Sequence, residues 1–207
     1  MTRIKRNEVI DEALGLLDET GLDGVSTRRL AQRLGVESAS LYWHFKNKSE
    51  LLNEMSAAVL VRHHLHSPPE RVDDWRDFIL NNARSFRNAL LAHRDGARLH
   101  AGTRPTASEV DRIFAKIGYL VRAGFTEHEA GMALYATSQF TIGCVLEEQA
   151  RLSQDAEDPE HHSKSEKVAV KVPRSAKAEA EVPSATEAFE FGLDLLVQGL
   201  EKRRRPR

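Results

Sequence analysis

The sequence predicts an all-α protein with a small N-terminal head and a larger helical domain, and three observations support this fold class. Apolar residues recur every three or four positions through most of the chain, which is the spacing of one helix face. Several of these segments open with Ser, Thr or Asn followed three residues later by Glu, the pattern of an N-terminal capping box. With 207 residues and 41% hydrophobic content, the chain can also bury a substantial core.

Three helical segments are expected in the head, residues 1–47. The first, residues 5–20, has apolar residues at helical spacing and stops at Gly21. The second places Leu30, Ala31 and Leu34 on one face, and Gly35 supplies a sharp turn. The third is a short amphipathic segment whose apolar residues are Ala39, Leu41, Tyr42 and Phe45.

Residues 26–48, STRRLAQRLGVESASLYWHFKNK, therefore have the layout of a helix-turn-helix DNA reader, with the last segment as recognition helix. The basic residues of this stretch outnumber its one acid, Glu37, and give a local charge of about +4 that can face phosphates. They are Arg28, Arg29, Arg33, Lys46 and Lys48. Because the whole chain has a net charge of −1, DNA binding must be local and oriented. The alternative is an ordinary helical hairpin with a solvated basic face.

The larger domain, residues 48–207, is expected to consist of long helices. Asn47 with Glu50 predicts the start of a helix that continues to His63 or His64, and Pro68 breaks the chain after it. A long core helix follows, with Trp75, Phe78, Ile79, Asn82, Phe86 and Leu90 close to one stripe. Further capping boxes are Thr106 with Glu109, Thr126 with Glu129 and Ser184 with Glu187.

The end of the chain combines a polar segment with an apolar helix. Residues 152–183 contain no aromatic residue, and we expect a mobile loop with at most one short helix. The final helix, about 184–202, is apolar on more than one face, which favours a subunit interface in a bundle. The basic tail KRRRPR could contact DNA or acidic surfaces, but a solvated charged end is the simpler interpretation.

A ligand site is expected around residues 93–106, HRDGARLHAGTRPT. Asp95, Gly96, Gly102 and Pro105 break this stretch into a short turn held between long helices, and broken backbone inside a bundle often marks a site. His100 and Thr103 would lie close together there, with Arg104 and Pro105 at the edge. Other polar residues on apolar helices also have ordinary structural interpretations: His64 as a helix C-cap, Asn82 as a satisfied core amide and Glu147 as a surface acid.

Taken together, one imidazole and one carboxylate with room for waters suit an octahedral ion such as Mg²⁺. A structural zinc site is disfavoured, because no Cys/His cluster at ligand spacing exists. Pro68 follows His63, His64 and His66 closely, which favours a fraying helix end over a metal site there. No phosphate-binding loop or serine acylation motif is present, and one imidazole is a thin ligand set for catalysis, so an enzyme is not expected. The single cysteine, Cys144, is expected to be a buried small hydrophobe, and without a secretory or spanning segment we expect a cytoplasmic protein.

The head resembles the DNA-binding domain of the TetR family of bacterial repressors, through Thr27, Arg28, Leu30, Ala31, Gln32, Leu34, Gly35, Leu41, Tyr42, Trp43, His44, Lys46, Asn47 and Lys48. The rest resembles the tetracycline repressor branch of that family. The stretches that carry this resemblance are RHH at 62–64, 81–100, GTRP at 102–105, GF at 124–125 and 139–149.

The resemblance implies a homodimer with a four-helix interface that binds double-stranded operator DNA and releases it when each subunit takes up a tetracycline-like inducer with Mg²⁺. The implied DNA-binding residues are Thr27, Arg28, Ser38, Ala39, Ser40, Tyr42, Trp43, His44 and Lys48. The implied ligand-binding residues are His64, Asn82, Phe86, His100, Thr103, Arg104, Pro105, Lys116, Ile117, Gly131, Leu134 and Gln139. His100 would ligate the metal, while Thr103 and Glu147 of the other subunit would hold its waters.

Several residues depart from the family pattern. Lys116, Gly131 and Gln139 stand where the family usually has glutamine, a larger aliphatic residue and histidine, so a different small molecule is the alternative inducer. A lysine beside a metal site adds like charge unless an acid pairs with it. Residues 38–40 are Ser-Ala-Ser where the family usually has Gln, Pro and Thr. Serine cannot read adenine bidentately as glutamine can, so a different operator sequence is expected.

Overall fold

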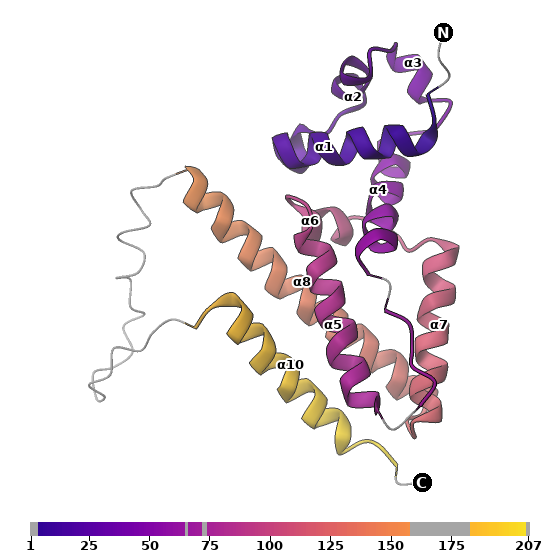
Figure 1. Cartoon of the computed structure of the whole chain (residues 1–207), viewed down its shortest axis with the longest axis vertical. Helices are drawn as coiled ribbons and strands as arrows, with labels where there is room; N and C mark the ends of the chain where they lie inside the picture. Colours follow the sequence, from indigo (N-terminus) through magenta and orange to yellow (C-terminus); the bar gives the residue numbers. More distant parts are fainter. Residues whose placement is uncertain (1–3, 65, 72–73, 158–182, 206–207) are drawn as a thin grey trace, which may run out of the picture.

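The computed structural model describes residues 4–64, 66–71, 74–157 and 183–205, and this part of the chain is helical without any strand. The helices are α1 (Arg6–Gly24), α2 (Thr27–Leu34), α3 (Ser38–Leu41), α4 (Lys48–His63), α5 (Trp75–Leu91), α6 (Gly96–Ala101), α7 (Ala107–Arg122), α8 (Glu127–Glu157) and α10 (Ala185–Glu201). Figure 1 shows α1 to α3 as a separate head above the larger bundle, with α4 running from one to the other. Among the described residues, none of these helices is both long and apolar enough to span a bilayer.

The head forms as the apolar pattern predicts. Leu30 and Ala31 of α2 and Leu41 after it are buried against α1, in one cluster with Val9 and Leu17. Ser26 caps α2 by accepting a hydrogen bond from the Arg29 amide at 3.3 Å. Gly35 ends the helix in the left-handed region, at φ 67°, which glycine adopts without strain. The predicted three-helix arrangement is confirmed.

α4 carries the chain out of the head. The Asn47 Oδ1 accepts a hydrogen bond from the Glu50 amide at 2.9 Å, while the Glu50 carboxylate accepts from the Lys46 amide instead of the Asn47 amide. The N-terminus of α4 is therefore capped, but by a variant of the predicted box. The helix ends at His63, within the predicted limit.

α5 is the central helix of the bundle, and it contacts α4, α6, α8 and α10. Its Trp75, Phe78 and Ile79 are buried with residues of α7 and α8, and its Ala83 is buried with Phe189 of α10. The three capping boxes predicted for α7, α8 and α10 all form. This part of the bundle also contains a largely buried ion pair. The guanidinium of Arg87 on α5 lies 2.7 Å from a carboxylate oxygen of Glu148.

Two elements differ from the sequence-based expectation. The segment between α5 and α7 is a six-residue helix, α6, instead of a turn, because Asp95 in the left-handed region (φ 55°) starts a new helical turn. The predicted loop of residues 152–183 begins too early, because α8 continues to Glu157. The remainder of that loop, residues 158–182, lies outside the described residues. Cys144 is half-buried, and burial raises the pKa of its thiol.

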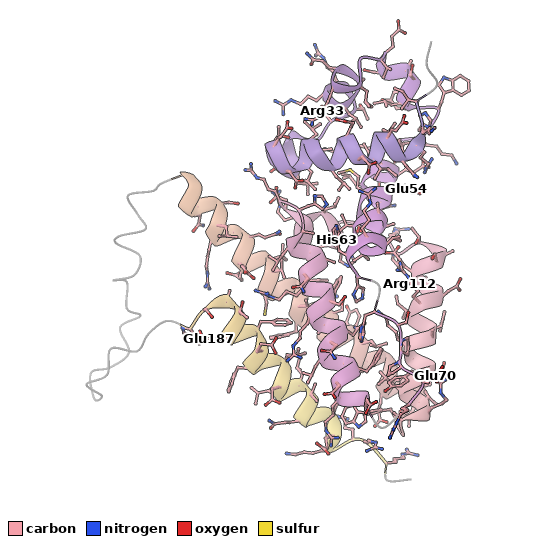
Figure 2. The ribbon with its side chains drawn as sticks, viewed as in Figure 1. Arg33, Glu54, His63, Glu70, Arg112 and Glu187 are labelled. Atoms are coloured by element: carbon pink, nitrogen blue, oxygen red, sulfur yellow. The ribbon has the colours of Figure 1, made fainter. Side chains whose placement is uncertain are left out.

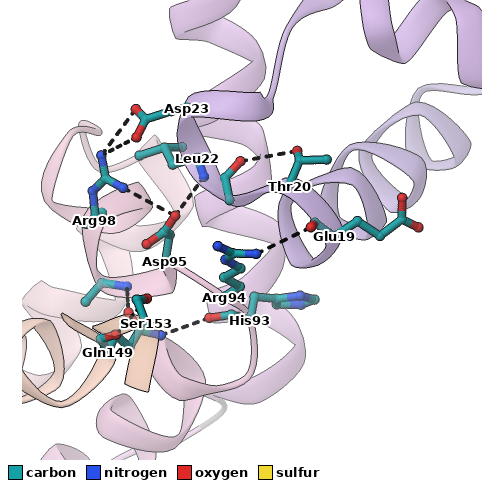
Figure 3. A network of polar contacts seen from close by, with 12 residues as sticks. Glu19, Thr20, Leu22, Asp23, His93, Arg94, Asp95, Arg98, Gln149 and Ser153 are labelled. Atoms are coloured by element: carbon teal, nitrogen blue, oxygen red, sulfur yellow. Dashed lines mark hydrogen bonds and ion pairs between the residues drawn. The ribbon is translucent and has the colours of Figure 1, made fainter. Parts of the chain in front are cut away.

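Side-chain and main-chain groups hold α6 on both sides. The Asp95 Oδ2 accepts a hydrogen bond from the Leu22 amide of the head at 2.8 Å. On the bundle side, the Gln149 side chain of α8 donates to the carbonyl oxygens of Leu90 and His93 and accepts from the Ala97 amide. It thereby satisfies main-chain groups that a helix end leaves without partners. Figure 3 shows this network between the head and α8.

The basic tail folds back on the bundle. The Arg204 Nε donates to the Ala123 carbonyl at 2.8 Å, and the Arg205 amide donates to the Gly124 carbonyl at 3.2 Å. These contacts lie at the end of the molecule opposite the head (Figure 1). The described part of the tail therefore lies far from the DNA-reading segment of its own chain. It is not a freely solvated end, because Arg204 and Arg205 are held by main-chain carbonyls that follow α7.

Gly96 is required by close packing at the start of α6. A Cβ at this position would lie 2.2 Å from the Leu90 carbonyl oxygen, a backbone atom that cannot turn away. We expect Gly96→Ala to lower the free energy of unfolding by about 1–3 kcal/mol. Chemical denaturation measures this change. Gly118→Ala is the matched control, since its Cβ would meet only the end of Arg122 at 3.8 Å, and a smaller loss for Gly96→Ala than for the control would contradict the packing argument.

Candidate functional site

The bundle encloses a cavity of about 350 Å³ between α4, α5, α6, α7 and α8. Its lining is largely apolar, with a small number of polar side chains, which is the usual composition of a small-molecule site. The residues that line it are Leu60, His64, Asn82, Ala83, Phe86, His100, Thr103, Arg104, Pro105, Glu109, Arg112, Ile113, Lys116, Gly131, Leu134, Tyr135, Thr137, Ser138 and Thr141.

The first polar corner of the cavity contains His100 and Thr103. The His100 Nδ1 lies 3.3 Å from the Ser56 Oγ, and the Thr103 hydroxyl lies 3.2 Å from the same oxygen and donates to the His100 carbonyl at 2.8 Å. Burial lowers the pKa of His100, so its imidazole is neutral at neutral pH. Its Nε2 has no hydrogen-bond partner among the described residues. If Nδ1 donates to Ser56, the Nε2 lone pair is available to a metal.

The second polar corner contains His64 and Lys116. The Lys116 Nζ lies 3.0 Å from the His64 Nε2, and the His64 Nδ1 lies 3.0 Å from the Ser85 Oγ. Burial, with the nearby Lys116 charge, lowers the pKa of His64 to about 3. Burial, with the nearby Arg112 charge, lowers the pKa of Lys116 to about 8. Among the described residues, Lys116 thus pairs with the His64 imidazole and not with the acid that a lysine beside a metal site would require.

An aromatic and amide wall joins the two corners. The Phe86 ring centroid lies 5.5 Å from that of His64 and 5.1 Å from that of His100. The Asn82 Oδ1 is buried and has no hydrogen-bond partner among the residues described, which is costly for a polar atom. The structural interpretation of Asn82 as a satisfied core amide therefore does not hold. An oxygen of this kind is available to a donor group on a ligand.

The structure brings most of the expected ligand residues together and leaves two aside. Those that line the cavity are His64, Asn82, Phe86, His100, Thr103, Arg104, Pro105, Lys116, Gly131 and Leu134. Ile117 does not line the cavity but is half-buried against the neighbouring apolar cluster. Its Cδ1 would lie 4.0 Å from a Cβ added to Gly131. Gln139 is exposed on α8 and does not line the cavity of its own chain.

Glu147 is also exposed on α8 and does not line the cavity. Residues 139, 143 and 147 are spaced four apart, so Gln139, Gly143 and Glu147 form one exposed stripe of the helix. A carboxylate in this position cannot serve the cavity of its own subunit from the inside. Its expected role toward the other subunit is consistent with this placement.

The sequence alone did not indicate several residues of the site, among them Ser56, which contacts His100 but does not itself line the cavity. Ser56 lies among apolar residues of α4 and is 4% exposed, and a polar residue next to the apolar stripe of that helix was the available signal. Glu109, Arg112 and Lys116 follow one another on a single face of α7, at a spacing of three and four. Of these three, only Lys116 was expected to contact a ligand; Glu109 was predicted as part of a capping box, and Arg112 was not singled out.

The three histidines at the end of α4, for which a zinc site was not expected, point to different surroundings. His64 faces the cavity, His66 stacks on Phe78 with ring centroids 5.4 Å apart, and His63 meets His93 edge-on at 6.0 Å. Within the described ranges no group of three or more His, Cys, Asp or Glu side chains could hold a metal by itself. Any metal at His100 needs oxygen ligands from a bound molecule or from water.

The expected DNA-reading surface is exposed at the top of the head. Trp43 is 89% exposed and Tyr42 is 57% exposed, although Tyr42 was expected on the buried face of its segment. The surface also includes Arg28, Ala39, Ser40 and Lys48, which are exposed, and Thr27, Ser38 and His44, which are partly buried. Large aromatic side chains at such positions are otherwise unfavourable in water.

The positive charge of this surface is smaller than the residue count implies. Arg33 faces α1, where its guanidinium lies 2.6 Å from carboxylate oxygens of both Glu12 and Glu19 (Figure 2). Hydrogen bonds to these two acids raise the pKa of Arg33. Arg33 therefore fixes α2 against α1, and the exposed Arg28, with its neighbour Arg29, is left as the basic group of α2.

The burial of Lys116 predicts a pH-dependent stability. Below pH 8 the lysine is charged in both the folded and the unfolded state, so the cost of burying it beside Arg112 and near His64 and His66 is fully present. Glu109 is the one acid among the described residues that line the cavity. Between pH 8 and 10.5 the folded protein loses the proton first and the cost disappears. We expect Lys116→Met to raise the free energy of unfolding by about 1–3 kcal/mol at pH 7, with a smaller gain at pH 10.

Urea denaturation at both pH values measures this gain. Lys202→Met, which removes an exposed lysine, is the matched control and should change neither value. A loss of stability for Lys116→Met at pH 7 would contradict the argument.

Comparison with known proteins identifies the family. A model of the tetracyclin repressor-like C-terminal domain matches residues 67–204, and a model of bacterial regulatory proteins of the tetR family matches residues 9–55. Tetracycline repressor protein class A from transposon 1721 of Escherichia coli is 47% identical over 209 residues, which cover 99% of this chain and 94% of the relative.

Solved structures agree with this assignment. TetR(class A) in complex with 5a,6-anhydrotetracycline and magnesium is 44% identical, with a TM-score of 0.77 over 97% of this chain and 100% of that one. A glutamine-to-alanine variant of TetR from Acinetobacter baumannii AYE, in complex with minocycline, is 40% identical, with a TM-score of 0.79 over 98% and 99% of the two chains. The chain therefore belongs to the TetR family of bacterial regulatory proteins, and it is a ligand-responsive DNA-binding repressor and not an enzyme.

Proposed function

We propose that this repressor leaves its operator when the bundle cavity takes up a tetracycline together with Mg²⁺. The observation that carries the proposal is the pairing of a neutral His100, whose Nε2 has no partner in the described part of the chain, with the Thr103 hydroxyl at one end of an apolar cavity. The similarity to tetracycline repressors over nearly the whole chain favours this inducer over an unrelated small molecule.

The residues present fit such a complex. A hard divalent ion takes oxygen ligands and waters, with a neutral imidazole as an acceptable nitrogen ligand. His100 would hold the ion, Thr103 would hold one of its waters, and Glu147 of the other subunit would hold another. When bound, the ion supplies positive charge that neutralises acidic oxygens of the drug. The buried Asn82 Oδ1 is available to a drug donor, and Phe86 offers an aromatic wall.

The connection to the head runs through α6. This helix ends next to His100 and Thr103 in the cavity and begins at Asp95, which accepts a hydrogen bond from the head at Leu22. A ligand that moves His100 must therefore also displace the contact between α6 and the head. In a dimer this changes the spacing of the two recognition helices, which must match half-sites about one DNA turn apart.

The dimer would form through α8 and α10. Phe191 and Leu195 are 69% and 52% exposed and lie four residues apart on one face of α10. Leu152 of α8 is 61% exposed. Apolar residues of this size need a partner, and a second copy of α8 and α10 would complete a four-helix bundle. Such an interface would also bring Gln139 and Glu147 near the other subunit.

Titration of the full-length protein with tetracycline and Mg²⁺, followed by drug fluorescence, tests the inducer. We expect saturable binding that EDTA abolishes, and at least tenfold weaker binding by His100→Ala, since removing even an outer-shell residue of a metal site typically costs about that much. His128→Ala is the matched control, because His128 is exposed at the start of α8 and should bind normally. If the unaltered protein shows no saturable binding, the tetracycline assignment is wrong.

The DNA-reading surface is tested through Arg28. A duplex selected by the unaltered protein from a random pool serves as the probe. We expect Arg28→Ala to weaken its binding by about tenfold or more, since a bidentate base contact is worth roughly 1–3 kcal/mol. The control is Arg122→Ala, which removes an exposed arginine at the end of α7. Equal affinities of Arg28→Ala and the control would place the reading surface elsewhere.

A further inference from the structure

We propose that Lys116, and not His64, is the donor that a ligand meets at the second corner of the cavity, and that it selects effectors carrying an oxyanion such as an enolate, phenolate or carboxylate. The inference deepens the proposed function, on which it relies for the location of the effector but not for its identity. Three arguments support it, from the hydrogen bonds of His64, from the charge of the cavity wall and from the cost of burying Lys116 there.

The hydrogen bonds around His64 fix its protonation. A lysine ammonium has three N–H donors and no acceptor, so the Lys116 Nζ, 3.0 Å from the His64 Nε2, donates to it. The His64 Nε2 must then be unprotonated, and the proton resides on Nδ1, which donates to the Ser85 Oγ at 3.0 Å. Both ring nitrogens of His64 are occupied within the protein. His64 has no donor left for a ligand, whereas Lys116 keeps two.

The cavity wall around Lys116 is positively charged. Arg104, Arg112 and Lys116 line the cavity, against Glu109 as the one acid among its described lining residues. The Glu109 carboxylate is engaged in capping α7, where its Oε2 accepts from the Thr106 amide and hydroxyl at 2.6 Å each. Arg112, which Figure 2 marks on α7, forms no ion pair with a described residue. An anionic ligand would balance the excess positive charge of this wall.

A purely structural role does not explain the lysine. Lys116 is only 9% exposed, and among the residues that the structure describes neither it nor Arg112 is paired with a carboxylate. The arrangement therefore costs free energy in the absence of a ligand. A neutral side chain at position 116 would pack there without that cost. A bound oxyanion would offset it, because hydrogen bonds between charged groups are about twice as strong as neutral ones.

The test compares two fluorescent probes of equal shape, 9-anthracenecarboxylate and the neutral 9-anthracenecarboxamide, bound to the full-length protein without metal. We expect the unaltered protein to bind the carboxylate about tenfold more tightly than the amide. Lys116→Met and Lys116→Gln should lose this preference while keeping their affinity for the amide. Lys202→Met, the control, should keep both affinities. Thermal unfolding and DNA binding of each variant establish that it is folded.

The outcomes separate this inference from the proposed function. Equal affinities for the two probes in the unaltered protein, no saturable binding of the carboxylate, or an undiminished preference in both Lys116 variants would each overturn it. None of these results depends on tetracycline. Conversely, a clear carboxylate preference without any tetracycline binding would retain the oxyanion site and reject the tetracycline assignment.

Discussion

The hydrogen bond between the Asp95 carboxylate and the Leu22 amide is the contact on which the rest of this structure depends, because it joins the DNA-reading head to the helix that borders the ligand cavity. It forms only because the backbone allows a close approach. Gly21 has a φ of 70°, and a Cβ there would lie 2.9 Å from the Asp95 Oδ2. Asp18 extends the junction through His93. Asp23 extends it through Arg98 (Figure 3).

α6 can transmit a displacement from the cavity to the head because it is short and is held at both ends. One end is fixed by the head and by Gln149 of α8, and the other carries His100, whose ring contacts Ser56 of α4. A helix of six residues has few internal hydrogen bonds, so its position is set by these outer contacts and not by its own stability. Under the proposed function, ligand binding and DNA binding would therefore compete for the position of this short helix.

The cavity combines two polar corners with opposite preferences. At His100 a neutral imidazole with an available lone pair favours a cation, while at Lys116 an ammonium beside Arg112 favours an anion. Phe86 lies between them and contacts both histidine rings. A ligand that carries a metal at one end and an acidic oxygen at the other would satisfy both corners, and a neutral apolar molecule would satisfy neither. This polarity is a stronger constraint on the effector than the volume of the cavity.

The sequence by itself determined the all-α fold, the helix-turn-helix head and most of the helix boundaries, because these depend on local signals: apolar spacing, capping boxes and the glycine at position 35. It also indicated most of the cavity residues, partly through the broken segment at 93–106 and partly through family resemblance. Only the tertiary structure decided how charges and donors pair across the chain. Arg33 forms an ion pair with an acid of α1, and Ser56 contacts the His100 ring. Lys116 contacts the His64 Nε2, and Gln139 is exposed outside the cavity of its own chain. Such pairings join residues tens of positions apart, and no local pattern encodes them.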